Sequence, residues 1–127
     1  MILHLVLAGA VEHGRGELEL HIPEFSWIEC VNILWKQVRF RGLSQTSAEQ
    51  IVVELLAIPF QIVSVSNLLP RALGLGLTHQ LAVYDSLYIA LALELDCPLI
   101  TVDQRQAEAA ARSGVILKAI ADFSPQE

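Results

Sequence analysis

The chain has 127 residues, which is the usual size of one domain and enough to bury a modest core. Hydrophobic residues make up 54% and charged residues 17%, against roughly 45–50% and 25% on average, so we expect an oligomer to cover part of the surface. The net charge of −6 excludes attraction of nucleic acid by the overall field, which leaves a local basic patch or a metal for that task.

Hydrophobic periodicity and helix breakers predict alternating helices and strands in one α/β domain. In chain order we expect a helix over 1–13, a strand over 18–22, a helix over 24–42, a helix over 43–59, a strand over 60–65, a helix over 67–76, a helix over 84–96, a strand over 98–102, a helix over 104–114 and a strand over 115–120. This order implies one parallel sheet with helices on both faces. We assign residues 1–122 to the domain and 123–127 to a tail.

Two helices are predicted to bury a single apolar stripe each. The first stripe consists of Trp27, Val31, Leu34, Trp35 and Val38. The second stripe consists of Tyr84, Leu87, Tyr88, Leu91 and Leu95. Local signals should set the helix ends: Gly42 after the first of these helices, Ser44 or Thr46 as the next N-cap, and the Gly74/Gly76 pair as a C-terminal stop.

The cysteines and the apolar runs bear on location. Cys30 and Cys97 form no CxxC motif and lie in apolar runs, so we expect buried free thiols and a reducing cytoplasm. No apolar run reaches the roughly 20 residues that span a bilayer, so we expect no membrane segment. The first eleven residues, MILHLVLAGAV, lack the basic start of a signal peptide.

Three acidic residues lie near the ends of predicted elements. Asp103 follows an apolar strand, Asp85 opens a helix, and Glu29 lies near the start of another helix beside Asn32 and off its apolar stripe. Ligands of open α/β sheets bind at the carboxyl ends of strands, so these acids could share one rim. Each also has a purely structural interpretation, since Asp85 and Asp103 could cap their helices and Glu29 could be an ordinary first-turn acid.

Clustered carboxylates are the ligands that hard divalent cations prefer, and Mg²⁺ needs only one or two of them. Such an ion can activate water and stabilise the charge that develops on a phosphodiester. Thr101 is either a support for this site or a strand residue with a satisfied hydroxyl. The segment KQVRFR, residues 36–41, is a weak candidate for a basic patch, and a solvated helix face is the favoured interpretation of it.

Two blocks of the sequence resemble the PIN domain, the nuclease fold of VapBC-type toxin ribonucleases. LTHQLAVYDSLYIALALELDCPLITVDQR is similar to the family's Tyr-Asp-Ala-Leu-Tyr helix and following Thr-x-Asp strand, and ELHIPEFSWIECVNILWK is similar to an earlier block. The resemblance implies that Glu29, Asp85 and Asp103 are three acids of a metal site, with Thr101 as a supporting hydroxyl. It further implies Mg²⁺- or Mn²⁺-dependent cleavage of RNA and a cognate antitoxin.

The start of the chain departs from the family pattern, because no aspartate precedes Asp85. We align residues 1–13 with the family's first helix, so that its first strand and first aspartate have no counterpart and the chain looks truncated or its start codon misassigned. Two strand edges would then pair with each other or with another chain, which favours a homodimer or higher oligomer. His4, His13, His21 and His79 were considered as substitute ligands, although a lone histidine is more often structural. The alternative function is a catalytically impaired PIN-fold protein that serves interaction or oligomerisation.

Overall fold

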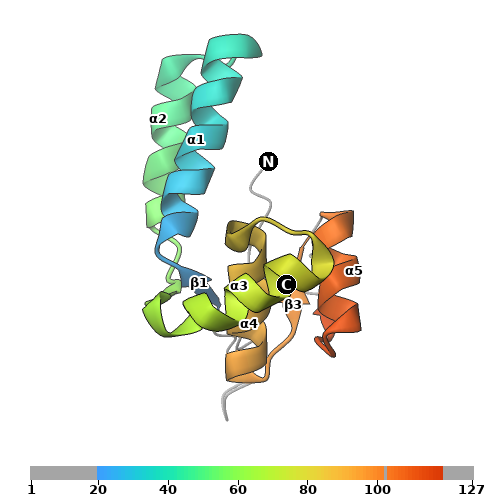
Figure 1. Ribbon diagram of the computed structural model, residues 1–127. Coiled ribbons are helices and arrows are strands. Elements are labelled where there is room, and N and C mark those ends of the chain that lie inside the picture. The colour runs from blue at the N-terminus through green and yellow to red at the C-terminus, as the bar shows by residue number, and fades with distance from the viewer. Residues whose placement is uncertain (1–19, 102, 119–127) are drawn as a thin grey trace.

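The structure of the chain is a computed structural model that describes residues 20–101 and 103–118. Helices and short strands are interspersed along it (Figure 1). The elements are β1 (His21–Pro23), α1 (Phe25–Phe40), α2 (Gln45–Leu56), β2 (Gln61–Val63), the 3₁₀ turn η1 (Ser66–Leu68), α3 (Leu69–His79), α4 (Val83–Leu95), β3 (Leu99–Ile100), α5 (Gln104–Arg112) and β4 (Leu117–Lys118). The helix predicted over 1–13 and the tail over 123–127 lie outside the described residues.

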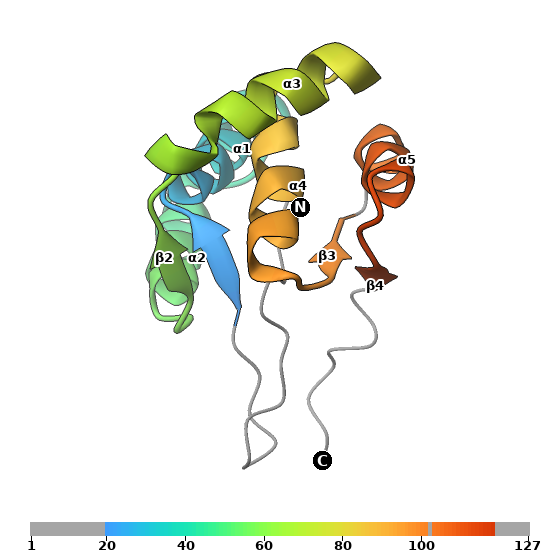
Figure 2. The same cartoon turned by 60° about the horizontal axis from the view of Figure 1, so that its bottom comes forward.

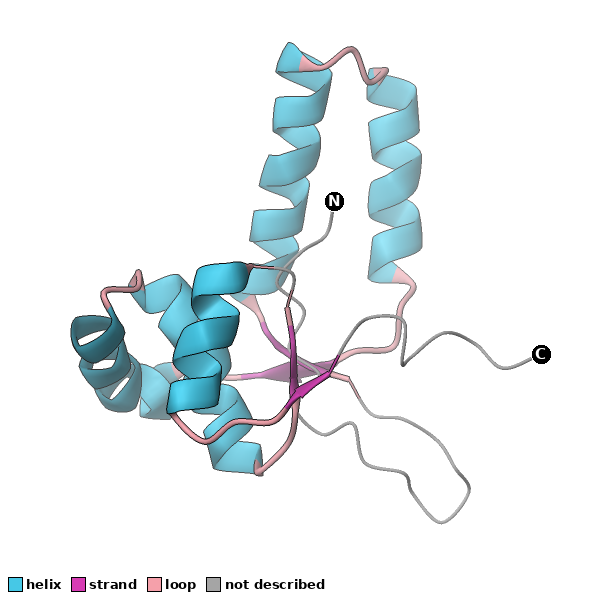
Figure 3. Cartoon of the chain, turned by 90° about the vertical axis from the view of Figure 1, so that its right-hand side faces the viewer, coloured by secondary structure: helices cyan, strands magenta, loops and turns pink. Residues whose placement is uncertain are grey.

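The described strands form two parallel pairs. Strand β1 pairs with β2 in the register His21↔Gln61, and β3 pairs with β4 in the register Leu99↔Leu117 (Figure 3). Parallel pairing requires a crossover between the partners, and the helices supply it. The predicted α/β class with parallel strands and covering helices is therefore confirmed, and within the described ranges the ladders are two separate pairs.

Helix α4 is the centre of the core. In Figure 2, α3 lies across one end of α4, and β1 and β3 lie on either side of it, in agreement with the packing of α4 on all three elements. Every residue from 86 to 92 is at most 4% exposed. The single stripe predicted for this helix was therefore wrong: Tyr84 is 62% exposed, while the helix body is buried on all sides.

Helices α1 and α2 form a hairpin that projects away from this core (Figure 1). They pack mainly on each other, with Gly42 at φ +81° in the turn between them. Ser44 is the N-cap of α2, because its hydroxyl oxygen accepts a hydrogen bond of 3.0 Å from the Ser47 amide. The cap signal at Ser44 was correct, and Thr46 lies inside the helix.

The apolar stripe predicted for α1 was only partly correct. Leu34 is buried, but Val31 and Trp35 are 42% and 55% exposed. The buried side of α1 instead carries Ser26 and Cys30, which face α4. A polar contact with α4 has thus fixed the rotation of the helix, which a count of apolar residues could not reveal.

Helix α3 does not end at the glycine pair, so that prediction was wrong. It continues to His79 and ends at Gln80, which adopts the left-handed conformation at φ 54°. Gly76 is needed for packing: a Cβ there would lie 2.8 Å from the Leu81 carbonyl oxygen. The glycine therefore lets α3 approach the chain that leads into α4.

Two further expectations concern the thiols and membranes. Cys30 and Cys97 are both free and buried, as predicted. Burial raises the pKa of the Cys30 thiol, and the neighbouring Glu29 carboxylate raises it further. No helix within the described ranges is long and apolar enough to cross a membrane.

Candidate functional site

Asp85 lies in the first turn of α4 and is half-buried. Ala82 occupies the N-cap position, so the interpretation of Asp85 as the cap of this helix was wrong. Its carboxylate instead stands at the positive end of the helix dipole, which favours an anion. The backbone carbonyl of Asp85 accepts a hydrogen bond of 3.0 Å from Nε2 of Gln106.

Asp103 is the N-cap of α5. One carboxylate oxygen, Oδ1, accepts a hydrogen bond of 2.8 Å from the Gln106 amide. The Asp103 amide in turn donates to the Thr101 hydroxyl at 3.0 Å, so Thr101 supports Asp103 directly. The capping interpretation is confirmed for Asp103, but a carboxylate has two oxygens, and capping occupies only one.

Gln106 connects these two acids and was not singled out from the sequence. Its amide holds the Asp103 side chain, and its side chain holds the backbone of Asp85. The residue is fully buried, and its Oε1 atom has no hydrogen-bond partner within the described part of the chain. The signal was present, because Gln106 stands three residues after the N-cap, where a capping box has its Glu or Gln.

Glu29 is tied to α4 by Tyr88. The Tyr88 hydroxyl donates to Oε1 of Glu29 at 2.6 Å and lies 2.6 Å from the Ser26 hydroxyl. A tyrosine has one hydroxyl proton, so Ser26 must donate to Tyr88 while Tyr88 donates to Glu29. Burial raises the pKa of Tyr88, and the bond to Glu29 adds to the effect, so this donor stays protonated.

The N-terminal end of α4 is thus the common anchor of the predicted acids. Asp85 and Tyr88 are one helical turn apart on α4. Tyr88 of α4 donates a hydrogen bond to Glu29 of α1. Gln106 of α5 donates one hydrogen bond to the Asp103 carboxylate and another to the backbone carbonyl of Asp85. Among the described residues, no three His, Cys, Asp or Glu side chains lie close enough to hold one ion, so the three-acid metal site stays a prediction.

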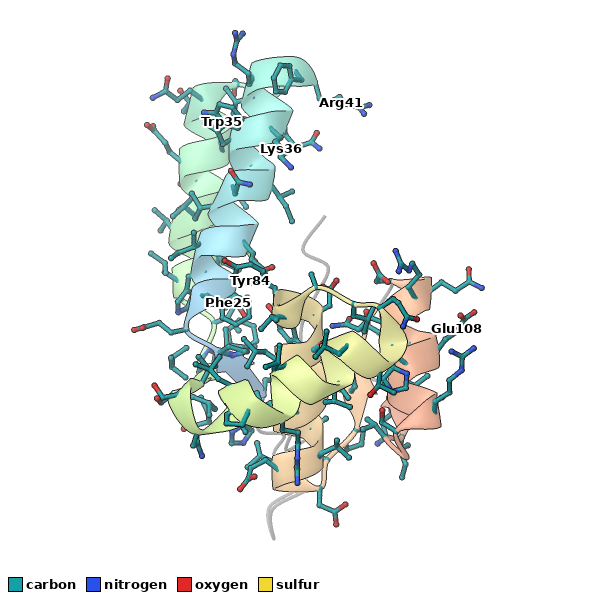
Figure 4. All side chains as sticks on the ribbon, viewed as in Figure 1. Phe25, Trp35, Lys36, Arg41, Tyr84 and Glu108 are labelled. Carbon is teal, nitrogen blue, oxygen red and sulfur yellow. The ribbon has the colours of Figure 1, made fainter. Side chains whose placement is uncertain are left out.

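Aromatic rings surround this end of α4. Phe25 makes edge-to-face contacts with Tyr84 and Tyr88, each with centroids 5.5 Å apart. Figure 4 shows Phe25 and Tyr84 together at the base of α1. Phe25 on α1 therefore packs against the ring of Tyr88, the residue whose hydroxyl holds Glu29.

The histidines considered as substitute ligands lie elsewhere or beyond the described ranges. His79 Nε2 is 3.2 Å from the Ser113 hydroxyl, at the end of α3. His21 is in β1. His4 and His13 precede the first described residue. Their role as ligands stays a prediction.

The sequence matches known proteins along most of its length. The family described as the PIN domain matches residues 2–112. Ribonuclease VapC3 of Pyrobaculum aerophilum is 34% identical over 92 residues, which cover 71% of this chain and 70% of that protein. Ribonuclease VapC12 of Mycobacterium tuberculosis is 32% identical over 101 residues, which cover 80% of this chain and 76% of that protein.

The fold has a counterpart among solved structures. The crystal structure of PAE2754 from Pyrobaculum aerophilum superposes with a TM-score of 0.65 at 23% identity and covers 76% of this chain. The match spans 65% of the length of the PAE2754 chain. At this identity the likeness supports the fold alone.

Proposed function

Because the chain belongs to the PIN domain family, we propose that it is an endoribonuclease of the toxin type, with Glu29, Asp85 and Asp103 as its metal-binding acids. Relatives that are named ribonucleases support the reaction class. The observation that carries the residue assignment is the anchoring of Glu29, from α1, and of Asp103, the N-cap of α5, to the N-terminal end of α4, where Asp85 lies.

The available ligands suit Mg²⁺ or Mn²⁺ chemically. Carboxylate oxygens are the hard ligands that these ions prefer, and Mg²⁺ is satisfied by one or two of them with water. We assign this role to Asp85 and Asp103, because Gln106 binds the Asp103 carboxylate through its amide and the Asp85 backbone carbonyl through its side chain. A bound divalent ion supplies Lewis-acid stabilisation of a phosphodiester and an activated water.

The chain's own residues act by orienting the carboxylates. Tyr88 fixes Oε1 of Glu29, and the Gln106 amide fixes Oδ1 of Asp103. Within the described part of the chain, Oε2 of Glu29 and Oδ2 of Asp103 stay available for a ligand. Ligands whose rotamers are locked by packing and hydrogen bonds bind without a further ordering cost, so this arrangement is preorganised for binding.

We also propose a cognate antitoxin, a homodimer or higher oligomer, and a cytoplasmic location. Large apolar side chains are exposed on α1, α2 and α3, among them Ile28 and Leu77, both at 71%. Exposed apolar surface of this kind is typical of protein interfaces. The free, buried thiols of Cys30 and Cys97 are consistent with a reducing compartment.

A second candidate is a PIN-fold protein without catalysis that serves interaction or oligomerisation. Two observations favour it: no group of three potential ligands lies together within the described ranges, and apolar surface is exposed. The two candidates differ in metal binding, because only the first requires it.

Cleavage of RNA with and without Mg²⁺ tests the proposal. We expect the wild type to cut RNA with Mg²⁺ or Mn²⁺ but not with EDTA, and Asp85→Asn and Asp103→Asn to lose at least 100-fold in rate. Equal cleavage by all three proteins would rule out this site. Calorimetric titration with Mg²⁺ separates the candidates: binding that Asp103→Asn abolishes supports the nuclease, and no binding at millimolar Mg²⁺ supports the interaction module.

A further inference from the structure

The far end of the α1–α2 hairpin concentrates positive charge on an acidic protein. Lys36, Arg39 and Arg41 lie within six residues of each other, and all three are exposed. No acidic residue occurs between Glu29 and Glu49, although the net charge of the chain is −6. The end of the hairpin is thus a local basic patch, which is what an anionic polymer requires for binding to such a protein.

One face of α1 connects this patch to the candidate site. Glu29, Asn32 and Lys36 follow at spacings of three and four, which places them on the same side of the helix. At 1.5 Å per residue, Lys36 is about 10 Å along the axis from Glu29. Figure 4 shows Lys36 and Arg41 on the half of the hairpin farther from α4, with Phe25 and Tyr84 at its base. An anionic polymer bound along this face would run from the base of α1 to its C-terminal end.

Exposed aromatic rings accompany the positive charges. Trp35 and Phe40 are both more than half exposed, and their rings meet edge to face at 6.0 Å. The Arg39 guanidinium lies 5.4 Å from the centre of the Phe40 ring. Basic side chains beside exposed aromatic rings are typical of surfaces that bind single-stranded nucleic acid, because phosphates pair with the charges and bases stack on the rings.

We propose that the hairpin tip, defined as Trp35, Lys36, Arg39, Phe40 and Arg41, binds single-stranded RNA next to the cleavage position. The inference rests on the proposed function, because it names the surface that holds that reaction's substrate. Lys36, Arg39 and Arg41 contact phosphates, and Trp35 provides a stacking surface. Sequence preference then comes from stacking at Trp35 rather than from the acids.

An apolar groove lies next to the tip, and an apolar protein segment is the alternative ligand that could bind there. Its lining includes Trp27, Ile28, Val31 and Trp35, and its volume is about 450 Å³. The basic side chains favour RNA as the ligand of the tip itself, because a purely apolar contact would gain nothing from three cations at its edge. The experiment below includes both occupants.

Fluorescence anisotropy of a labelled single-stranded RNA measures binding by the full chain in EDTA, where metal-dependent cleavage cannot occur. We expect the triple variant Lys36→Ala/Arg39→Ala/Arg41→Ala to bind at least 10-fold more weakly and to reduce the slope of log K against log salt by about 2. Trp35→Ala should weaken binding roughly 5-fold or more. The control, Arg71→Ala/Arg112→Ala, removes two exposed charges from α3 and α5, against three in the triple variant, and should bind like the wild type.

Equal losses in the tip variants and the control variant would overturn the proposal, and so would unchanged binding in the tip variants. A third outcome would assign the surface to a protein partner instead. In that case the wild type binds a protein segment, and Trp35→Ala loses this binding but binds RNA like the wild type. Failure of the proposed function looks different. Tip-dependent RNA binding without Mg²⁺-dependent cleavage would refute the nuclease and keep the tip, whereas cleavage with tip-independent binding would refute the tip alone.

Discussion

Helix α4 and the α1–α2 hairpin differ most in burial. Residues 86–92 of α4 are buried on every side, because α3, α5, β1 and β3 all pack on this helix. The hairpin buries only a narrow seam of five residues, which are Ser26, Cys30, Leu34, Ala48 and Leu55. The three candidate metal-binding acids are therefore held in place by the buried helix α4. The basic and aromatic residues of the hairpin tip lie on a part of the chain that the core leaves exposed.

This division matches what each task requires. Carboxylates that share an ion must keep their separation, and side chains mounted on buried elements do so best. A surface that holds a flexible strand of RNA needs exposed charges and rings, and a projecting hairpin presents them without disturbing the core. The base of α1 joins the two parts, because Tyr88 connects Glu29 and Ser26 to α4.

The largest expected effect tests the difference in burial itself. Leu91→Ala in α4 should lower the free energy of unfolding by about 2–5 kcal/mol, because it leaves a cavity at a fully buried site. Leu56→Ala, the same deletion at a 59% exposed residue of α2, should cost no more than about 0.5 kcal/mol. Urea unfolding of both variants provides the values. Equal losses would mean that the hairpin is covered in solution by a second chain.

The second prediction concerns the two glycines of α3. Gly76→Ala should destabilise the fold by about 1–3 kcal/mol, because its Cβ would meet the Leu81 carbonyl oxygen at 2.8 Å and the Ser86 hydroxyl at 3.2 Å. Gly74→Ala meets nothing within 4 Å and should stabilise the helix by about 0.5–1 kcal/mol. Thermal unfolding of the two variants should shift the midpoint in opposite directions, and a loss in both would contradict this packing.

The third prediction concerns the hydroxyl that joins the two regions. Tyr88→Phe should cost about 1–3 kcal/mol, since Ser26 and Glu29 each lose a buried hydrogen-bond partner. Tyr84→Phe removes a hydroxyl from a largely exposed ring of the same helix and serves as the control, with an expected cost below about 0.5 kcal/mol. Chemical unfolding at neutral pH measures both.

The same residue sets a pH dependence. Burial, then the bond to Glu29, raises the pKa of Tyr88 in the folded state, and the neighbouring Cys30 raises it further. The unfolded tyrosine releases its proton near pH 10, whereas the folded one retains it, so the stabilisation is complete below about pH 10 and is lost as the pH rises further. Unfolding followed from pH 8 to 11 should show a shallower decline for Tyr88→Phe than for the wild type. Parallel declines would show that the hydroxyl titrates equally in both states.

Local sequence signals predicted the ends of most helices and strands. They failed where contacts between distant parts of the chain set the end of a helix or its buried face. The Ser44 cap and the turn at Gly42, with φ +81°, depend on residues a few positions apart, so they could be predicted from the sequence. Helix α3 continues through Gly74 and Gly76 and ends only at Gln80, where the backbone is left-handed at φ 54°. The exposure of Trp35 follows from a contact between α1 and α4 that is long-range in sequence.

The same distinction applies to the candidate site. Glu29, Asp85 and Asp103 were predicted from their places near the ends of elements and then from a resemblance to family blocks, and both signals are local in sequence. Tyr88 was read only as part of an apolar stripe, although its hydroxyl reaches Glu29 across 59 positions of the chain. The bond from Gln106 to the Asp85 carbonyl spans 21 positions. Partners at such separations become visible only when the helices are packed.

The smallest expected effect lies within the hairpin and tests whether its stability is local. Ser44→Ala removes the hydroxyl that accepts from the Ser47 amide, and loss of an N-cap of this kind costs about 1 kcal/mol. Thr46→Ala changes an exposed residue inside the same helix and should cost less than about 0.5 kcal/mol. Because the hairpin packs little on the core, hydrogen exchange should rise in residues 45–56 of Ser44→Ala while the amides of α4 keep their protection. A rise in α4 as well would show that hairpin and core unfold as one unit.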